Sequence, residues 1–128
     1  MHQVVVAVIE KSGKFLLGKR SLHKKSAPGY WCPITGRIEH GETQEEALAR
    51  EVFEEAGLRV EPVRKIAEFP TRDQSALMHW WIVRLVGGEV TLNHENSEFR
   101  WVSVSEMREL EPIFTEDLAV FEGLASSI

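Results

Sequence analysis

The pattern of hydrophobic and polar positions divides the chain into short strands, with one well-defined helix among them. A nearly continuous apolar run predicts a core strand over about 3–10, and a polar turn at 11–14 leads into a second strand over 15–19. A polar loop covers about 20–29. Further apolar runs predict a short strand near Trp31 and strands over 60–69, 77–85, 89–92 and 98–104.

Between residues 44 and 56 the pattern becomes helical. Thr43 and Glu46 have the spacing of a capping box, and Gly57 suits the left-handed position that ends a helix. At about 100° per residue, the spacing predicts an apolar side that faces a core and an acidic side on another arc. The apolar side comprises Leu48, Ala49, Val52, Phe53 and Ala56, and the acidic side comprises Glu51, Glu54 and Glu55.

Two shorter helices are predicted near the C-terminal end, one over about 105–109 and one that Thr115 caps and that runs to about 124. This order of elements predicts an α/β (α+β) fold in which a mixed sheet is flanked by helices. The length of 128 residues predicts a single domain over 1–128.

Charge and cysteine content narrow the class of protein. With 15 basic and 20 acidic residues the net charge is −5, so a non-specific nucleic-acid binder is not expected. Cys32 is the only cysteine, which excludes an internal disulfide and fits a reducing cytoplasm. The apolar run at 4–9 is short and has no basic leader, so neither a signal peptide nor a membrane span is expected.

The three carboxylates on the acidic side of the helix are the strongest chemical signal. Like charges on one turn repel each other, and a plain solvated face is the alternative interpretation. However, no Lys lies on that arc, while Arg50 stands beside it. Grouped carboxylates are the ligands that Mg²⁺ and Mn²⁺ prefer, so this arc predicts a divalent-cation site.

Residues 36–58 read GRIEHGETQEEALAREVFEEAGL. This segment matches the signature G-x5-E-x7-R-E-U-x-E-E-x-G-U, with U a large aliphatic residue, and so the chain resembles the Nudix hydrolase family. The resemblance implies an α/β/α sandwich of the Nudix type. It also implies hydrolysis of a nucleoside diphosphate-X by water attack on phosphorus, with Mg²⁺ or Mn²⁺ as cofactor.

The resemblance also implies roles for the residues of the signature. Glu51, Glu54 and Glu55 correspond to metal-binding carboxylates, and Glu51 and Glu54 are also candidate catalytic residues. Arg50 corresponds to the residue that orients the carboxylates through ion pairs, and Glu42 to a supporting acid.

The start of the signature departs from the common family pattern. Many members have consecutive glycines there, whereas this chain has Thr35 before Gly36. The resemblance implies that Gly36 contacts substrate and that the carbonyl of Thr35 completes the metal shell. A β-branched residue disfavours positive φ, so the loop geometry at Thr35 is expected to differ from that of the family.

The general base lies outside the signature in several family members. Glu98 is the first candidate here and Glu95 the second, and a box carboxylate that holds no metal, Glu51 or Glu54, is a further alternative. An ordinary carboxylate at a strand edge is the plain interpretation of Glu98.

Three features suggest where substrate binds. Arg20, in the basic run 19–25, is the best candidate for a phosphate ligand, with a solvated loop as the alternative. Tyr30 offers an aromatic surface for a base. Alternation along the strand sends Trp80 and Trp81 to opposite faces, which predicts one in the core and leaves the other to line a cleft.

The leading hypothesis is a metal-dependent pyrophosphohydrolase for a small nucleotide such as a (d)NTP or modified NTP. A catalytically silent Nudix module that senses a nucleotide derivative is the alternative from another class. An isoprenoid diphosphate isomerase is a remote third alternative, because it needs a catalytic Cys and Cys32 lies before the loop of the signature. The expected partner is a small-molecule nucleotide, without nucleic acid or membrane, and a homodimer is possible because dimers are common in the family.

Overall fold

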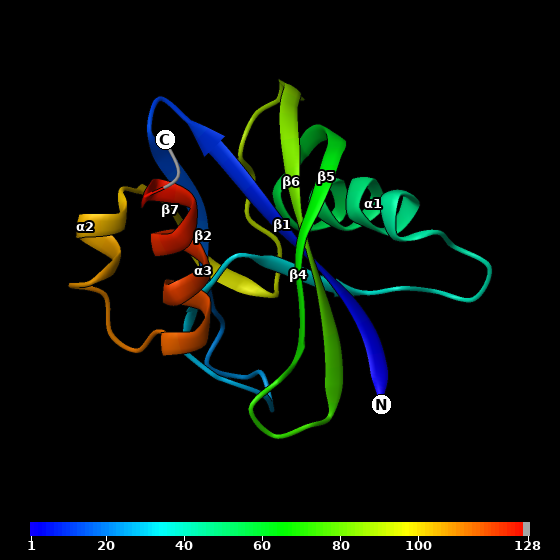
Figure 1. Ribbon diagram of the computed structural model, residues 1–128, viewed down its shortest axis with the longest axis horizontal. Coiled ribbons are helices and arrows are strands. Elements are labelled where there is room, and N and C mark those ends of the chain that lie inside the picture. Colours follow the sequence, from blue (N-terminus) through cyan, green and yellow to red (C-terminus); the bar gives the residue numbers. More distant parts are fainter. Residues whose placement is uncertain (127–128) are drawn as a thin grey trace.

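The computed structural model describes residues 1–126 and contains one mixed sheet with three helices (Figure 1). The strands are β1 (His2–Lys11), β2 (Lys14–Arg20), β3 (Trp31–Cys32), β4 (Ile34–Arg37), β5 (Leu58–Pro70), β6 (Ala76–Gly88) and β7 (Asn96–Val102). The helices are α1 (Gln44–Ala56), α2 (Val104–Met107) and α3 (Thr115–Ser126).

β1 is the central strand of the sheet. It runs parallel to β6, with Val6 opposite Trp80, and antiparallel to β4 through its first half and to β2 through its last residues. β5 pairs antiparallel with β6 on one side, while β2 pairs antiparallel with both β3 and β7 on the other. The predicted mixed sheet is therefore confirmed.

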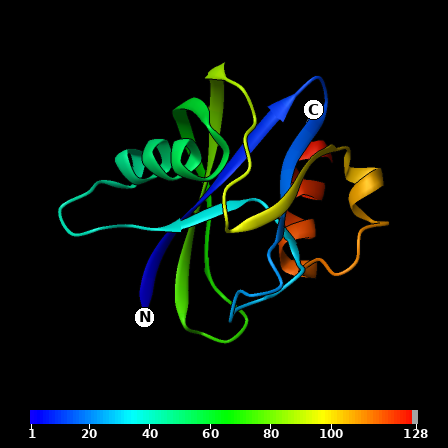
Figure 2. The ribbon, with the colours of Figure 1, turned by 180° about the vertical axis from the view of Figure 1, so that it is seen from behind.

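Helices cover both faces of this sheet, α1 on one face and α3 with α2 on the other, as the front and back views show (Figure 1, Figure 2). Val5, Ala7 and Ile9 of β1 pack in the cluster under α1, and Val6 and Val8 pack in the cluster under α3. A strand that is buried on both faces reads as a continuous apolar run, which explains the pattern over residues 4–9. The predicted α/β/α sandwich is confirmed.

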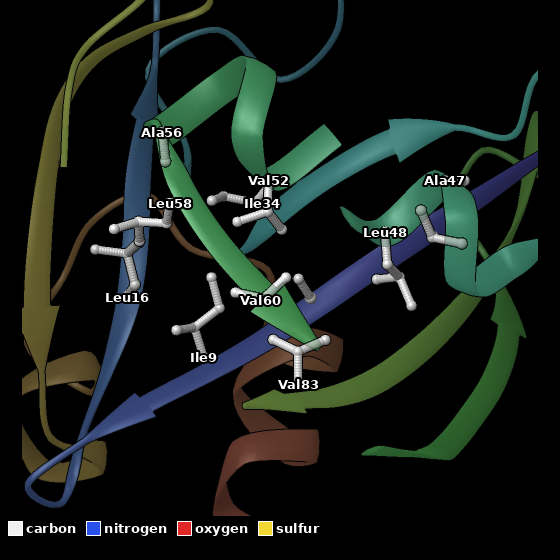
Figure 3. Packing of buried hydrophobic residues seen from close by; sticks show 12 residues of the cluster. Ile9, Leu16, Ile34, Ala47, Leu48, Val52, Ala56, Leu58, Val60 and Val83 are labelled. Atoms are coloured by element: carbon white, nitrogen blue, oxygen red, sulfur yellow. The ribbon is translucent and has the colours of Figure 1, made fainter. Parts of the chain in front are cut away.

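The core under α1 draws on the helix and on several strands (Figure 3). Leu48, Val52 and Ala56 of α1 are almost fully buried against side chains from β1, β2, β4, β5 and β6. This packing fixes α1 on the sheet, so that the acidic side of the helix has a defined position relative to β4.

Residues 89–92 do not form the strand that was predicted. Instead, the amide of Thr91 donates to the carbonyl of Ala56 at 2.8 Å, and the Asn93 side chain donates to the carbonyl of Glu54 at 3.2 Å. The segment thus satisfies carbonyls at the C-terminal end of α1, which have no partner within the helix. β4 was not predicted, because its four residues were interpreted as the start of a loop.

The two tryptophans of β6 do lie on opposite faces. Trp80 is fully buried between Phe69 and Phe121. Trp81 is partly buried under α1, where its Nε1 donates to the side chain of Gln44 at 2.8 Å. No helix within residues 1–126 has the length and apolar character needed to cross a membrane.

Candidate active site

The helix that carries the signature acids begins and ends as its sequence predicts. The Thr43 hydroxyl accepts from the amide of Glu46 at 3.1 Å, and the Glu46 carboxylate accepts from the amide of Thr43 at 2.9 Å. Gly57 ends the helix at φ 71°, in the left-handed region. These caps set the register of Arg50, Glu51 and the acids that follow.

Arg50 is the hub of an ion-pair network at the start of the site. Its Nε and Nη2 donate to the Glu42 carboxylate at 2.6 and 2.9 Å, and its Nη1 donates to Glu51 at 2.8 Å and to Glu54 at 3.1 Å. Hydrogen bonding to Arg50 lowers the pKa of Glu42 to about 2. The Arg50 side chain also donates to the carbonyl of Arg37 and so ties α1 to the end of β4.

The Glu51 carboxyl group lies directly against Gly36 of β4. A Cβ atom on Gly36 would overlap Cγ, Cδ and Oε2 of Glu51. Only glycine leaves this space free, which gives the first glycine of the signature a steric role. Thr35 beside it has no positive φ and pairs with Val6 in the sheet, so a β-branched residue is accommodated there without strain.

Glu55 and Phe53 exchange the environments predicted for them. Glu55 is only 6% exposed, whereas Phe53 is 53% exposed, with Arg59 over its ring. The buried face of α1 is centred on Val52. Glu55 comes three residues after Val52 and so lies on nearly the same side of the helix. Phe53 comes one residue after Val52 and is rotated from it by about 100°.

Burial raises the pKa of Glu55, and the adjacent Glu51 carboxylate acts in the same direction. Its Oε2 is buried and has no hydrogen-bond partner within the described chain. A buried carboxyl oxygen without a partner is costly unless a proton or a cation satisfies it.

The three acids do not form the preassembled cation cluster that was expected. Within residues 1–126, no three Asp, Glu, His or Cys side chains are grouped as they are in a metal site. The reason is that Nη1 of Arg50 lies between Glu51 and Glu54 and binds both, while Glu55 lies in the protein interior. A cation bound by all three requires these side chains to turn toward one another.

A cavity of about 1030 Å³ opens beside Glu51. It is lined by several residues that the sequence singled out for metal or substrate binding: Arg20, Tyr30, Thr35, Gly36 and Glu51. Lys24 and Lys25, from the same basic run as Arg20, also line it. The structure thus brings Glu51 of the signature and the basic run 19–25 to one cavity, and Trp81 is not among the residues that line it.

The two predicted substrate-binding side chains are held in place by neighbours. Nε of Arg20 donates to the carbonyl of Ser26 at 3.0 Å. The ring of Tyr30 stacks on Phe114, with centroids 4.4 Å apart and an interplanar angle of 25°. Phe114 also lines the cavity, so this stacked pair forms part of its wall.

The two candidates for the general base lie in different places. Glu95 lines the cavity and contacts Lys24 at 3.7 Å. Glu98 is not among the lining residues, and its carboxylate accepts from Arg100 at 2.8 Å. The geometry therefore favours Glu95, the second of the two in the sequence-based ranking.

Asp117 is a site residue that the sequence did not single out. It lines the cavity and is only 7% exposed. Burial raises its pKa to about 7. A signal was present, because Asp117 stands four residues before the core residue Phe121, at a position where the helix pattern calls for an apolar side chain.

The chain is similar to known proteins over nearly its whole length. A family model described as the NUDIX domain matches residues 1–122. The NAD-capped RNA hydrolase NudC of Vibrio parahaemolyticus is 30% identical over 125 residues, which cover 97% of this chain and 47% of NudC. The CTP pyrophosphohydrolase of Escherichia coli K12 is 30% identical over 124 residues, which cover 96% of this chain and 90% of that protein.

Among solved structures, the MutT protein from Methanosarcina mazei Go1 superposes with a TM-score of 0.85 and 26% identity, over 98% of this chain and 94% of that one. The chain spans less than half the length of the NudC relative. The match to the family model covers nearly all of the sequence, including the whole signature at 36–58. The chain therefore belongs to the NUDIX domain family, that of the Nudix hydrolases.

Proposed function

We propose that this protein is a divalent-cation-dependent pyrophosphohydrolase that cleaves a nucleoside diphosphate-X, with a small nucleotide such as a nucleoside triphosphate as its substrate. The observation that carries the proposal is the composition of the cavity beside Glu51. Its wall combines Glu51 with the basic residues Arg20, Lys24 and Lys25. Hydrolysis of a phosphoanhydride requires carboxylates that hold cations and basic side chains that bind phosphate oxygens.

Glu51, Glu54, Glu55 and the carbonyl of Thr35 are the residues proposed to hold Mg²⁺ or Mn²⁺. Two features support the assignment: the orphaned Oε2 of Glu55 and the space over Gly36 that admits the Glu51 carboxylate. Hard oxygen donors suit these cations. When bound, the cation neutralises charge on the diphosphate and lowers the pKa of a coordinated water.

The remaining roles belong to side chains of the protein. Arg20, with Lys24 and Lys25, binds phosphate oxygens, since guanidinium can grip phosphate through two hydrogen bonds. Arg50, held by Glu42, keeps Glu51 and Glu54 in position.

A carboxylate then accepts the proton of the attacking water, and Glu95 is the candidate within the cavity. Glu98 stays a candidate only through a rearrangement that releases it from Arg100.

The test is release of nucleoside monophosphate and pyrophosphate or phosphate from a panel of substrates with Mg²⁺ or Mn²⁺. The panel includes the common nucleoside triphosphates, ADP-ribose, NAD, nucleotide sugars, dinucleoside polyphosphates and NAD-capped RNA. Glu54→Gln is expected to abolish turnover. Glu45→Gln is the matched control, because Glu45 is exposed in the first turn of the same helix.

The same experiment separates the alternatives. A wild-type protein that is inert on the whole panel, yet binds a nucleotide in calorimetry, would support the silent sensor. Burial raises the pKa of the Cys32 thiol to about 12, which leaves little thiolate at neutral pH and weighs against an isomerase with a catalytic cysteine.

A further inference from the structure

Asn96 is a buried polar residue to which the proposed chemistry gives no role. It is only 8% exposed and begins β7, where it lies opposite Arg20 at the end of β2. A buried amide group costs stability unless it forms hydrogen bonds. The groups that surround the Asn96 side chain therefore indicate what this residue does.

A bulge in β7 determines the face of the sheet on which the Asn96 side chain lies. Phe99 packs in the cluster under α1, whereas Val102 packs in the cluster under α3. Strict alternation would put Asn96 on the same face as Val102, because an even number of residues separates the two. However, the register of β2 against β7 shifts after Lys19, which leaves Ser97 as an extra residue in β7. A bulge of this kind redirects the side chain next to it, here toward the α1 face.

Two contacts place the Asn96 side chain on the α1 face. A Cβ atom on Gly18 would lie 2.7 Å from Oδ1 of Asn96 and 2.9 Å from the ring of Phe99. The Asn96 side chain also hydrogen-bonds to the carboxyl group of Glu55 on α1, and this bond lowers the pKa of Glu55. A hydrogen bond that lowers the pKa of a carboxyl group is donated to its ionised form, so the amide nitrogen of Asn96 is the donor.

The surroundings of Glu55 explain why it needs a donor. Burial and the neighbouring acids Glu51 and Glu95 all disfavour the ionised form of Glu55, and the Asn96 amide acts in the opposite direction. Oε2 of Glu55 has no hydrogen-bond partner within residues 1–126. The bond from Asn96 therefore engages the other oxygen and leaves Oε2 available to a cation.

We propose that Asn96 is a positioning residue for the metal site, whose amide holds one oxygen of Glu55 so that the other oxygen faces the divalent cation. The inference deepens the proposed function, on whose metal site it rests. Carboxylates that bind metals are themselves hydrogen-bonded, and loss of such a partner typically costs about 10- to 100-fold in metal affinity or activity.

The start of β7 gives Asn96 a rigid support. The amide of Ser21 donates to the carbonyl of Glu95 at 3.0 Å, and the Ser21 hydroxyl donates to the carbonyl of His94 at 2.9 Å. These bonds fix the backbone just before Asn96 to the end of β2. A residue that orients another side chain needs such a support, because its own position must be fixed.

The decisive experiment measures binding of Mn²⁺ alone, by calorimetry and by the paramagnetic resonance signal of free Mn²⁺, and needs no turnover. Asn96→Leu keeps nearly the same size and shape but removes the donor. We expect this variant to bind Mn²⁺ about 10- to 100-fold more weakly than the wild type. Ser97→Ala is the control and should bind as the wild type does, because Ser97 is exposed in the bulge beside Asn96.

A double-mutant cycle separates a role through Glu55 from a merely structural one. In Glu55→Gln the charged ligand that Asn96 orients is already absent, so the further change Asn96→Leu should lower the Mn²⁺ affinity by less than about threefold. A structural role would lower the affinity by the same factor in both backgrounds. Thermal unfolding without cation verifies that the variants are folded, and Asn96→Ala takes the place of Asn96→Leu if the larger side chain prevents folding.

Unchanged Mn²⁺ binding by Asn96→Leu, or an equal loss with and without Glu55→Gln, would overturn the inference and leave the proposed function in place. Mn²⁺ binding that Glu55→Gln leaves unchanged would remove Glu55 from the site and would also overturn the inference alone. A wild-type protein that binds no Mn²⁺ would refute the proposed metal site, and the inference with it.

Discussion

The Glu51 carboxyl group lies against the α-carbon of Gly36, in the space where any other residue would carry its Cβ. Glu51 comes from α1 and Gly36 from β4. The contact therefore sets how closely the acidic side of the helix approaches the strand that lines the cavity.

Gly36→Ala should displace Glu51 and lower turnover. The new methyl group overlaps three atoms of Glu51, so the whole side chain must move. We expect a loss of about 1–3 kcal/mol in the free energy of unfolding, and a loss of about a hundredfold in kcat/KM for a misplacement of about 1 Å. Urea unfolding and steady-state kinetics measure the two effects. Gly87→Ala is the control, because a Cβ atom at residue 87 would lie in open space. Equal activity of the two variants would contradict the steric role of Gly36.

Arg50→Lys should lower kcat more than it alters KM. Lysine cannot reproduce the two hydrogen bonds to Glu42 while also holding Glu51 and Glu54. Loss of a residue that orients ligands typically costs about 10- to 100-fold in activity or metal affinity. Kinetics at saturating Mg²⁺ test this, with the exposed Arg59→Lys as control. A raised KM with unchanged kcat would show instead that Arg50 binds substrate.

Mg²⁺ should stabilise the wild-type protein against heat. A ligand present at about 100 times its Kd stabilises the folded state by about 2.7 kcal/mol. Glu55→Gln should reduce the rise in Tm, because the amide removes a charged ligand while it keeps the shape of the side chain. Glu45→Gln should respond as the wild type does. The same rise in Tm for Glu55→Gln and the wild type would remove Glu55 from the metal site.

Asp117 should make stability fall as pH rises from about 4 to 7. Its pKa in the folded state is about 7, against an ordinary value of 3.8, so the folded state binds the proton more tightly than the unfolded state does. Its contribution is fully present below the unfolded pKa and is lost as pH rises through the folded pKa. The loss is at most about 4 kcal/mol, at 1.36 kcal/mol per pKa unit.

Urea unfolding of the wild type and Asp117→Asn across this pH range isolates the effect, because other raised groups such as Glu55 are common to both. The difference in free energy of unfolding should favour the variant above pH 7 and shrink toward pH 4. Parallel curves for the two proteins would show that Asp117 has an ordinary pKa.

Arg72→Ala should affect substrate binding more than stability. The ion pair with Glu116 is exposed on both sides, at 57% and 38%, and such pairs contribute about 0–1 kcal/mol. Arg72 also packs on Phe114, which stacks on Tyr30 in the cavity wall. We expect KM to rise several-fold with little change in kcat. A double-mutant cycle with Glu116→Gln separates the ion pair from the contact with Phe114, and a loss of more than about 2 kcal/mol in stability would assign the pair a structural role.

The helix and the central strand were predictable because their signals are local. The caps of α1 depend on residues three apart, and the run at 4–9 reflects burial of β1 on both faces. The side of α1 on which Glu55 lies was not predictable, since the exact centre of a buried face depends on what packs against it. β4 was not predicted, because the four residues that pair with β1 do not show the alternation of apolar and polar positions that indicates a strand.

The residues of the candidate site were also only partly predictable from the sequence. The signature located Arg50, Glu51 and Gly36 from sequence, because the spacing within one helix and its preceding loop is rigid. Asp117 enters the cavity only through the docking of α3, and Glu95 gains its position over Glu98 from the register of β7. Both depend on contacts between residues that are far apart in the sequence. Only Asp117 carries a local signal, its spacing of four residues from the core residue Phe121.

The segment between β6 and β7 connects the end of α1 to the loop that follows β2. Thr91 and Asn93 anchor it to the end of α1, while the carbonyl of Glu95 accepts from the amide of Ser21 at 3.0 Å, at the base of the basic loop. Lengthening this connection by even one residue would release the basic run 19–25 from its fixed position relative to α1. We therefore expect natural variation in loop length to be scarce here and common in the turn at 71–75.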